Sequence, residues 1–485
     1  MVLSPIKLEP HGERGFIDEE KANEIITLWT TQLREHKQKL LQQQDQESNN
    51  NNNLILCNRI SLTDKSYSAS AAKLIANFLK EPFDGIDTPI AHNIIEADIS
   101  DCIAGRLTEE GLVVLQTLCD AFSNSNLVTV NLSDNAIGQQ GIGACKTALS
   151  KKSLQSVALC NNGLSQETMA QVADILTNDE DGTTGCIASN LTCIHFYNNM
   201  SGLGGCKEFA RILEKCRNLE DVRFSSTRAG KEGSDIVASA LDASLSMGYN
   251  PKLTKLDLCD NNFANKSSHE ALFRALGSTK SLRYLNLRDC DLEDDGVKKV
   301  CHALFESDSA LEHLDLSGNE VGKRGAKHIA DYIRDCGGQL KVLHLEDNCD
   351  MTSKGAEHIA AAFHGSEDGH SIEEIQLNSC MIGAMGARAL IDAYGPEGKD
   401  LPNLKKILLN GNSFTEEIVG ELEVAFDNRL GELDDNDSDG DADDDMSDDD
   451  EDEDDDEEEE QEESGGKDEA AVDDLAEAMG KSLVV

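Results

Sequence analysis

The amino-acid sequence predicts an α/β solenoid, in which one short unit is repeated and stacked along the chain. The phrase L-x-x-L-x-L-x-x-N/C-x-L recurs at least ten times between Ile94 and Phe414, for example as LEHLDLSGNEV at 311–321. Successive phrases open 27 to 37 residues apart, and three consecutive steps are 29 residues. A stretch with helical periodicity follows each phrase, as at 325–333. Each unit therefore predicts one strand and one helix.

A period near 29 residues leaves room for a full helix on the outer side of each unit. We expect a leucine-rich-repeat solenoid, a ribonuclease-inhibitor-like horseshoe with parallel strands on the concave face and helices on the convex face. The first phrase, at 55–60, is degenerate, as a terminal repeat often is. The later phrases open at Ile94, Leu127, Leu154, Leu191, Leu219, Leu253, Leu282, Leu311, Leu340, Ile372 and Leu404.

Composition divides the chain into four regions. The first 19 residues have no clear pattern and are expected to be flexible, and 19–45 has the helix formers and partial apolar stripe of a short helix. Low complexity predicts an Asn-rich linker next, and like-charge repulsion predicts a disordered acidic tail. The predicted regions are 1–53 (N-terminal segment with helix and linker), 54–430 (repeat domain), 431–466 (acidic tail) and 467–485 (short amphipathic helix).

The charge balance argues against a protein that binds nucleic-acid phosphates. The net charge is −49, and residues 432–463 contain 24 Asp and Glu with no Lys or Arg. Subtracting this tail leaves −25 for the rest of the chain, which is therefore acidic in its own right. The sequence has no run of about 18 apolar residues, so no membrane span is predicted. We expect no nucleic-acid partner.

The cysteines are predicted to be structural thiols. Their number, 15, is odd, and the N-terminus has no export signal. Cys102, Cys290 and Cys380 occupy the N/C position of the phrase, where a small buried side chain is needed. This usage favours a reducing compartment.

Asparagine fills the same position in most phrases and has a structural role there. Its amide is expected to bond to turn backbone groups that would otherwise be buried without a partner. The ladder asparagines are Asn135, Asn162, Asn199, Asn261, Asn319, Asn348 and Asn412.

Candidate functional residues lie beside this ladder, on the rim where strands pass into loops. The position directly before the ladder holds Asp134, Asn161, Asn198 and Ser226, whose side chains we expect to be free. Arg106 follows Gly105 in such a loop, and Arg228 and Lys231 add positive charge to the rim. From spacing alone, an ordinary solvated polar rim is the simpler interpretation. No nucleotide-binding, metalloprotease or nucleophile motif is found, so we expect neither an enzyme nor a cofactor.

The loop phrases carry more information than the period does. In order, DISDCIAGR (98–106), LSDNAIG (132–138), LCNNGL (159–164), FYNNMSG (196–202) and FSSTR (224–228) resemble the Ran GTPase-activating protein family, particularly its plant-type members. The resemblance covers about 55–427 and extends into the acidic tail. A generic leucine-rich repeat would have the ladder without these loops.

The resemblance implies a protein that stimulates GTP hydrolysis by Ran and so maintains the Ran gradient for nucleocytoplasmic transport. The family is understood to work without an arginine finger. By motif, Asn161 would order the catalytic glutamine of Ran, and Arg106 would support the interface or its loop. The resemblance assigns Asp134 and Asn198, in the neighbouring phrases, less directly. Together with Arg228 and Lys231, they are expected to bind the partner.

The expected partner is Ran-GTP, with a Ran-binding protein in the same complex as a further candidate. A cytoplasmic monomer is expected. No Trp-Pro-Pro motif accompanies Trp29, so enrichment at the nuclear envelope is left open. The alternative function is a leucine-rich-repeat binding protein or an acidic chaperone without effect on a GTPase.

Overall fold

The computed structural model of the chain describes residues 4–47, 54–138, 140–179, 185–264, 270–363, 371–395 and 401–437. These residues belong to one compact unit, Met1–Asp443. The predicted acidic tail beyond residue 437 and the predicted terminal helix lie outside the described residues.

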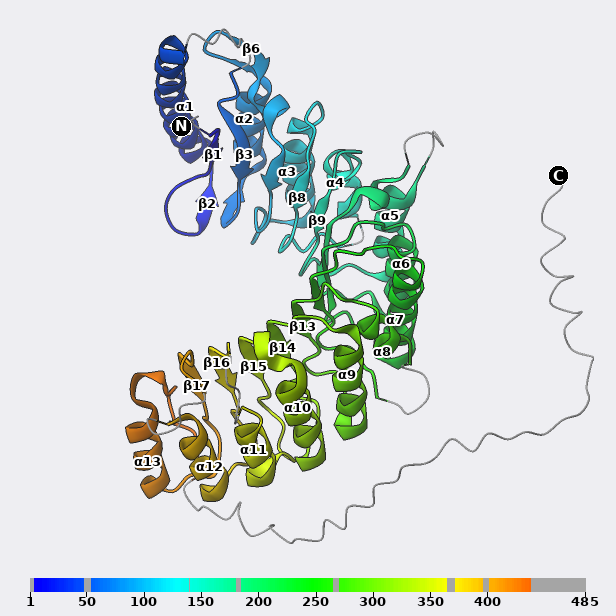
Figure 1. Cartoon of the computed structure of the whole chain (residues 1–485). Helices are drawn as coiled ribbons and strands as arrows, with labels where there is room; N and C mark the ends of the chain where they lie inside the picture. Colours follow the sequence, from blue (N-terminus) through cyan, green and yellow to red (C-terminus); the bar gives the residue numbers. More distant parts are fainter. Residues whose placement is uncertain are drawn as a thin grey trace, which may run out of the picture. The chain divides into compact units, whose positions relative to one another are not determined.

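A parallel sheet runs through the whole described chain (Figure 1). Its strands follow sequence order, and each pairs in parallel with the next. Strands β2, β4, β5 and β6 do not belong to this sheet. Two small two-stranded sheets, β2–β4 and β5–β6, lie near the N-terminus. In the described residues the thirteen strands of the long sheet are β1 (Ile6–Leu8), β3 (Cys57–Ser61), β7 (Glu96–Asp98), β8 (Thr129–Asn131), β9 (Ser156–Ala158), β10 (Cys193–Tyr197), β11 (Asp221–Ser225), β12 (Lys255–Asp257), β13 (Tyr284–Asn286), β14 (His313–Asp315), β15 (Val342–His344), β16 (Glu374–Gln376) and β17 (Lys406–Leu408), and the short pairs are β2 (Gly15–Ile17) with β4 (Lys65–Tyr67) and β5 (Pro82–Phe83) with β6 (Ile86–Pro89).

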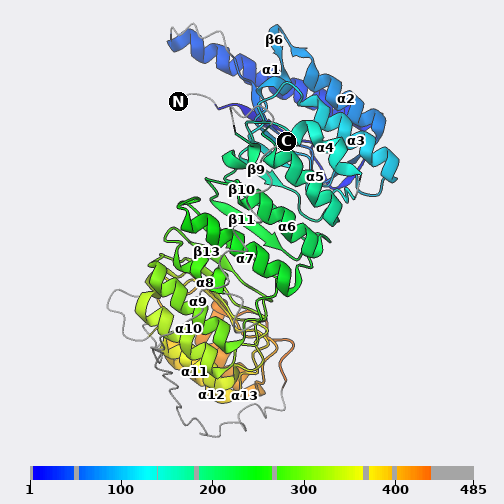
Figure 2. The same ribbon diagram turned by 90° about the vertical axis from the view of Figure 1, so that its right-hand side faces the viewer.

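A layer of helices covers one face of this sheet (Figure 2), and the strands line the inner side of the curve in Figure 1. The predicted strand–helix unit and its parallel stacking are confirmed. We call the two sides the strand face and the helix face. The helices are α1 (Glu19–Glu47), α2 (Ala69–Lys80), α3 (Thr108–Ala121), α4 (Gly141–Leu149), α5 (Gln166–Thr177), α6 (Gly202–Leu213), α7 (Gly230–Ser246), α8 (Glu270–Gly277), α9 (Glu293–Ser307), α10 (Lys323–Cys336), α11 (Thr352–Ala361), α12 (Ala384–Tyr394) and α13 (Glu416–Phe426), with 3₁₀ turns at Ile90–Asn93, Ile187–Asn190, Gly337–Gln339 and Asp427–Arg429.

The apolar positions of the phrase stack into one continuous core between the sheet and the helices. Leu285 on β13 pairs in register with Leu314 on β14, which in turn pairs with Leu343 on β15. All three are completely buried. Because each leucine contacts its equivalents in the adjacent repeats, burial of apolar area is shared along the stack and no repeat is stable alone.

The ladder asparagines have the predicted structural role. The Nδ2 of Asn319 donates to the carbonyl oxygens of Leu287 (2.8 Å) and Leu316 (3.0 Å), and its Oδ1 accepts from the backbone N–H of Cys290 (3.1 Å). Asn319 is fully buried. The backbone N–H of Asn319 donates in turn to Oδ1 of Asn348 (2.9 Å), so adjacent repeats are linked through buried amides.

For the described residues 4–19, the expectation that the N-terminal segment is flexible is wrong. Strand β1 pairs with β3, and β2 pairs with β4, so this segment extends the sheet beyond the degenerate first phrase. Helix α1 follows and packs against α2. Its Trp29 is fully buried and donates from Nε1 to the carbonyl of Glu9 at 3.0 Å. Pairing covers the edge that β3 would otherwise expose.

The described residues contain no helix that is both long and apolar enough to cross a membrane. All 15 cysteines are free thiols, and those at the ladder positions are buried as predicted. Burial raises the pKa of the Cys380 thiol to about 12, so this group stays a neutral packing element.

Candidate functional site

The rim candidates share one unusual backbone conformation. The residue directly before each ladder position has a positive φ, for example +62° at Asp134, +51° at Asn161 and +53° at Asn198. This left-handed conformation lets the chain leave the strand sharply, and Asn, Asp and Gly tolerate it best. The left-handed row comprises Asp101, Asp134, Asn161, Asn198, Ser226, Asp260, Asp289, Gly318, Asp347, Ser379 and Gly411.

Backbone hydrogen bonds between adjacent repeats hold this row rigidly. The N–H of Asp134 donates to the carbonyl of Cys160 (2.9 Å), and that of Asn161 to the carbonyl of Tyr197 (2.6 Å). Asn161 lies between β9 and α5, where the side chain of Ser165 caps the helix by accepting from the N–H of Thr168. The loop is therefore fixed at both ends.

Three side chains of the row, those of Asp134, Asn161 and Asn198, bond to one another, which corrects the expectation that they are free. Nδ2 of Asn161 donates to Oδ1 of Asp134 at 2.8 Å, and Nδ2 of Asn198 donates to Oδ1 of Asn161 at 2.9 Å. All three side chains remain exposed. The stack places equivalent positions of adjacent repeats about 5 Å apart, which is within reach of short polar side chains.

This chain of bonds fixes the orientation of the Asn161 amide. An ionised carboxylate only accepts hydrogen bonds, so the NH₂ group of Asn161 must face Asp134 and its oxygen must face Asn198. An amide has two N–H donors and two acceptor positions, of which the row uses one each. One donor and one acceptor position of Asn161 therefore remain for a partner.

Arg106 lies beside this row but points into the fold. Its Nε donates to Oγ of Ser66 (3.0 Å), and its Nη2 donates to the carbonyl of Ser66 (2.8 Å). The guanidinium also lies 5.1 Å from the ring centre of Phe16 and 3.7 Å from a carboxylate oxygen of Glu110. Its side chain is only 17% exposed. Arg106 therefore ties the N-terminal β2–β4 pair to the loop that carries Gly105.

A cavity of about 530 Å³ connects Arg106 with the row, and Arg14, Asp101, Asp134 and Asn161 line it. Arg14 and Asp101 form an ion pair at 2.7 Å. Burial raises the pKa of Asp101 above its usual value, and the neighbouring Arg14 offsets only part of this rise. Neither Arg14 nor Asp101 was predicted as a site residue, although the position of Asp101 directly before Cys102 follows the same spacing as Asp134 before Asn135.

Two exposed apolar side chains flank this cavity. Phe16 is 59% exposed and Leu107 is 81% exposed. Leu107 lines the cavity, and the ring of Phe16 lies next to Gly105, where an added Cβ would approach it to 3.3 Å. Apolar side chains beside an exposed polar row are typical of a surface that binds protein.

Arg228 and Lys231 lie farther along the rim. Arg228 follows β11 with a φ of +59°, and Lys231 is in the first turn of α7. Both are exposed, and neither side chain has a hydrogen bond or ion pair among the residues that the structure describes. They do not line the cavity beside Asn161. The structure thus brings together Asp134, Asn161, Asn198 and Arg106, with the two cations as a separate extension.

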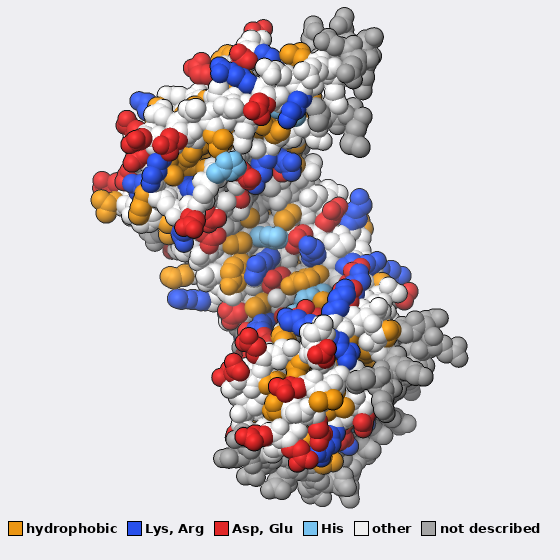
Figure 3. All heavy atoms as spheres, turned by 90° about the vertical axis from the view of Figure 1, so that its left-hand side faces the viewer, with side chains coloured by type: hydrophobic (Ala, Val, Ile, Leu, Met, Phe, Trp, Pro, Cys, Tyr) orange, Lys and Arg blue, Asp and Glu red, His pale blue; other side chains and the backbone are white. Residues whose placement is uncertain are grey.

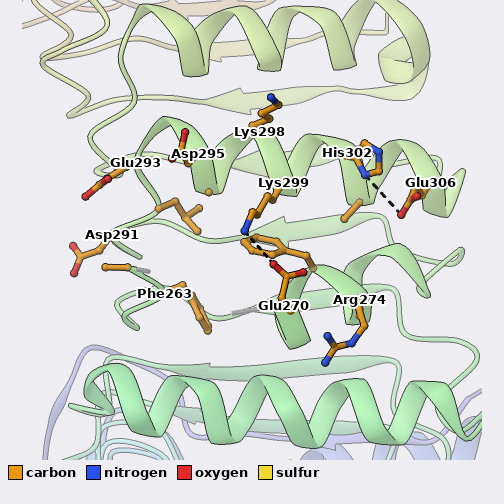
Figure 4. Close-up of a pocket in the computed structure, with 15 residues that line it drawn as sticks. Phe263, Glu270, Arg274, Asp291, Glu293, Asp295, Lys298, Lys299, His302 and Glu306 are labelled. Atoms are coloured by element: carbon orange, nitrogen blue, oxygen red, sulfur yellow. Dashed lines mark hydrogen bonds and ion pairs between the residues drawn. The ribbon is translucent and has the colours of Figure 1, made fainter. Parts of the chain in front are cut away.

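A second cavity, of about 860 Å³, lies on the helix face between α8 and α9 (Figure 4). Lys299 and Glu270 form an ion pair across it at 3.1 Å, and His302 lies 3.8 Å from Glu306. No predicted site residue lines it. These two pairs lie within the lining, whereas Arg274 pairs with Asp242 of α7, outside it.

The strand face carries many charged and histidine side chains (Figure 3). Arg223 lies 3.9 Å from the ring centre of Tyr197 and 3.0 Å from Oδ2 of Asp257. Two groups on this face have metal-ligating side chains close together: Cys193, His195 and Asp221, and His313, Asp315 and His344. Both lie on strands, away from the Asp134–Asn198 row.

Comparisons with known proteins support the repeat and give a partial match to Ran regulators. The leucine-rich-repeat family model matches residues 123–144, 280–301 and 309–330. RAN GTPase-activating protein 2 of Arabidopsis thaliana is 34% identical over 162 residues, which are 33% of this chain and 27% of that protein.

Other leucine-rich-repeat proteins match as well. Ribonuclease inhibitor of Sus scrofa is 24% identical over 219 residues, covering 40% of this chain and 47% of that protein. An internalin structure from Listeria monocytogenes has a TM-score of 0.33 at 14% identity, over 77% of this chain and 80% of the other. The chain spans less than half of these two sequence relatives, and its own strands, helices and ladder form a leucine-rich-repeat fold.

Proposed function

We propose that this protein is a GTPase-activating protein for Ran, and that Asn161 is the residue that acts on the GTPase. The observation that carries the proposal is the row Asp134–Asn161–Asn198, which holds one exposed amide in a fixed orientation. The partial similarity to a plant protein named as a Ran GTPase activator supports the choice of partner.

The chemistry needed from such an activator is positioning. A GTPase of this class has its own glutamine to orient the attacking water, and an activator without an arginine finger accelerates the reaction by holding that glutamine. The unused donor and acceptor of Asn161 match the donor and acceptor of a glutamine amide. Fixed orientation of reacting groups contributes orders of magnitude in rate.

Arg106 serves this proposal as a positioning residue. Its bonds to Ser66 and its contact with Phe16 join the N-terminal sheet to the 98–107 loop, which borders the cavity beside Asn161. Loss of Arg106 would release both the loop and the exposed Phe16 and Leu107. Arg228 and Lys231, as unpaired cations on an acidic protein, would contact acidic groups of the partner.

The second candidate is a binding protein that holds its partner without changing a reaction rate. The similarity to a ribonuclease inhibitor favours it, as does the acidic composition. Neither of these observations explains why one rim amide is oriented by a carboxylate.

Single-turnover hydrolysis separates the two candidates. Ran loaded with radiolabelled GTP is mixed with increasing amounts of the full chain, and phosphate release is followed alongside binding. The activator proposal predicts a rate that rises and saturates with protein concentration. Binding without any increase in rate would contradict it and favour the second candidate.

A further inference from the structure

Three adjacent strands bring two histidines and two carboxylates together on the strand face, away from the rim. His313 and Asp315 are two residues apart on β14, so their side chains point to the same side of the sheet. His344 on β15 pairs in register with Asp315. Glu374 on β16 pairs with Val342 and so lies diagonal to His344.

The distances in this cluster suit a shared metal ion better than hydrogen bonds. One ligand atom from each of His313, Asp315 and His344 lies within 4.8 Å of the others. Nδ1 of His344 lies 3.6 Å from Oδ2 of Asp315, which is too long for a hydrogen bond. Bond lengths of about 2.0–2.2 Å place two tetrahedral zinc ligands about 3.4 Å apart. Small side-chain rotations would bring all three atoms to that separation.

The cluster is largely buried and contains one polar atom without a partner. Asp315 is 7% exposed, and Nε2 of His344 is buried with no hydrogen-bond partner among the described residues. That nitrogen faces Oε1 of Glu374 at 3.7 Å. A histidine that binds a metal through one nitrogen commonly donates its other N–H to a carboxylate, and Glu374 is placed to accept it.

The ring of His313 is held in place by its neighbours. It stacks on Tyr284 with ring centres 4.3 Å apart, and it meets the ring of His344 at 5.0 Å. These contacts limit the rotation of the His313 ring within the cluster.

In the second metal-type group on this face, the side chains already bond to one another. Nε2 of His195 already bonds to Oδ1 of Asp221 at 2.8 Å and lies 3.5 Å from Sγ of Cys193. Its polar atoms satisfy one another, so this group needs no ion. It provides an internal comparison for the first cluster.

We propose that His313, Asp315 and His344 form a binding site for a zinc-class divalent metal ion, with Glu374 as the carboxylate that orients His344. Two imidazoles and one carboxylate are ligands that such ions prefer. Three protein ligands leave at least one coordination position for water or for a side chain of a bound protein. Strand β14 is five strands from β9, the strand that precedes Asn161, which is roughly 24 Å at about 4.8 Å per strand. The site is independent of the GTPase proposal.

Metal content of matched variants tests the site. The full-length protein, His344→Ala and His313→Gln are dialysed against micromolar zinc buffered by a weak chelator, and bound zinc is measured. His302→Ala, an exposed histidine on α9, and His195→Ala are the controls. The acidic tail and the free cysteines are identical in all of them, so their zinc cancels in the comparison.

The proposal predicts that His344→Ala and His313→Gln each lose one equivalent of zinc, while both controls keep it. Co²⁺ should give the visible absorption of a nitrogen-ligated low-coordinate site in the wild type and lose it in His344→Ala. Zinc should also raise the melting temperature of the wild type more than that of His344→Ala. Equal zinc in the wild type and a folded His344→Ala, or a loss only in His195→Ala, would overturn the proposal.

Discussion

An Asn161→Gly substitution removes the rim amide without straining the backbone. Asn161 has a φ of +51°, which glycine adopts freely, whereas alanine there costs roughly 1–2 kcal/mol. The substitution deletes the exposed bonds to Asp134 (2.8 Å) and from Asn198 (2.9 Å). At about 0.5–1.5 kcal/mol for each bond, we expect the free energy of unfolding to fall by about 1–3 kcal/mol. The repeat stack should stay folded.

The expected effect on the stimulated reaction is much larger. Removing one preorganised polar group from a transition state commonly lowers the rate by about 10²–10³. We expect Asn161→Gly to lower the maximal stimulated rate of GTP hydrolysis by Ran at least ~100-fold, with the affinity for Ran-GTP changed less than ~10-fold. Single-turnover hydrolysis at saturating protein measures the first, and fluorescence titration measures the second.

Asp260→Gly is the matched control for Asn161→Gly. Asp260 is exposed, has a φ of +54° and stands directly before ladder residue Asn261, but it lies outside the predicted site. It should keep full stimulation, and its free energy of unfolding should change less than that of Asn161→Gly, because the side chain of Asp260 has no hydrogen bond among the described residues. If Asn161→Gly is folded and also keeps full stimulation, the proposed role of Asn161 is wrong.

Three further predictions concern other parts of the chain. Arg106→Ala removes two hydrogen bonds to Ser66, so it should lower the free energy of unfolding by about 1–3 kcal/mol and also lower stimulation. A urea titration that shows no loss of stability would contradict the anchoring role of Arg106. Deletion of 438–485 should slow association with Ran more at low salt than at high salt, because salt screens charge steering, and stopped-flow rates with the same loss at both salts would contradict a steering role. Burial lowers the pKa of His195, but hydrogen bonds to Asp221 and Cys193 outweigh it and raise the pKa to about 10. The stability from this pair is therefore complete below about pH 6.5 and lost as the pH rises toward 10, so unfolding free energies of wild type and His195→Gln should converge over that range, and a constant difference would argue against the pair.

The repeat fold could be predicted because one sequence pattern occurs many times along the chain. A leucine such as Leu314 and an asparagine such as Asn319 recur at the same offsets, and only a parallel stack buries both sets. Strands β1 and β2 could not be predicted this way. Each has three residues, which is too short for an alternating pattern to stand out, and each is stabilised by a partner strand about 50 residues away in the sequence.

The candidate site was predictable in position but not in its bonding. The spacing before the ladder placed Asp134, Asn161 and Asn198 on one rim, which the structure confirms. The Asp, Asn and Gly residues before the ladder are compatible with a left-handed backbone, but the sequence does not indicate which of their side chains bond to one another. The anchor of Arg106 was missed for a different reason, since Ser66 belongs to a short strand 40 residues earlier.

The role proposed for Asn161 is best tested by the maximal rate of phosphate release from GTP-loaded Ran, measured with the wild-type protein and with Asn161→Gly side by side. The wild type is expected to give a rate well above that of Ran alone, and the variant a rate near that of Ran alone. A wild-type rate equal to that of Ran alone, while the two proteins are bound, would contradict it.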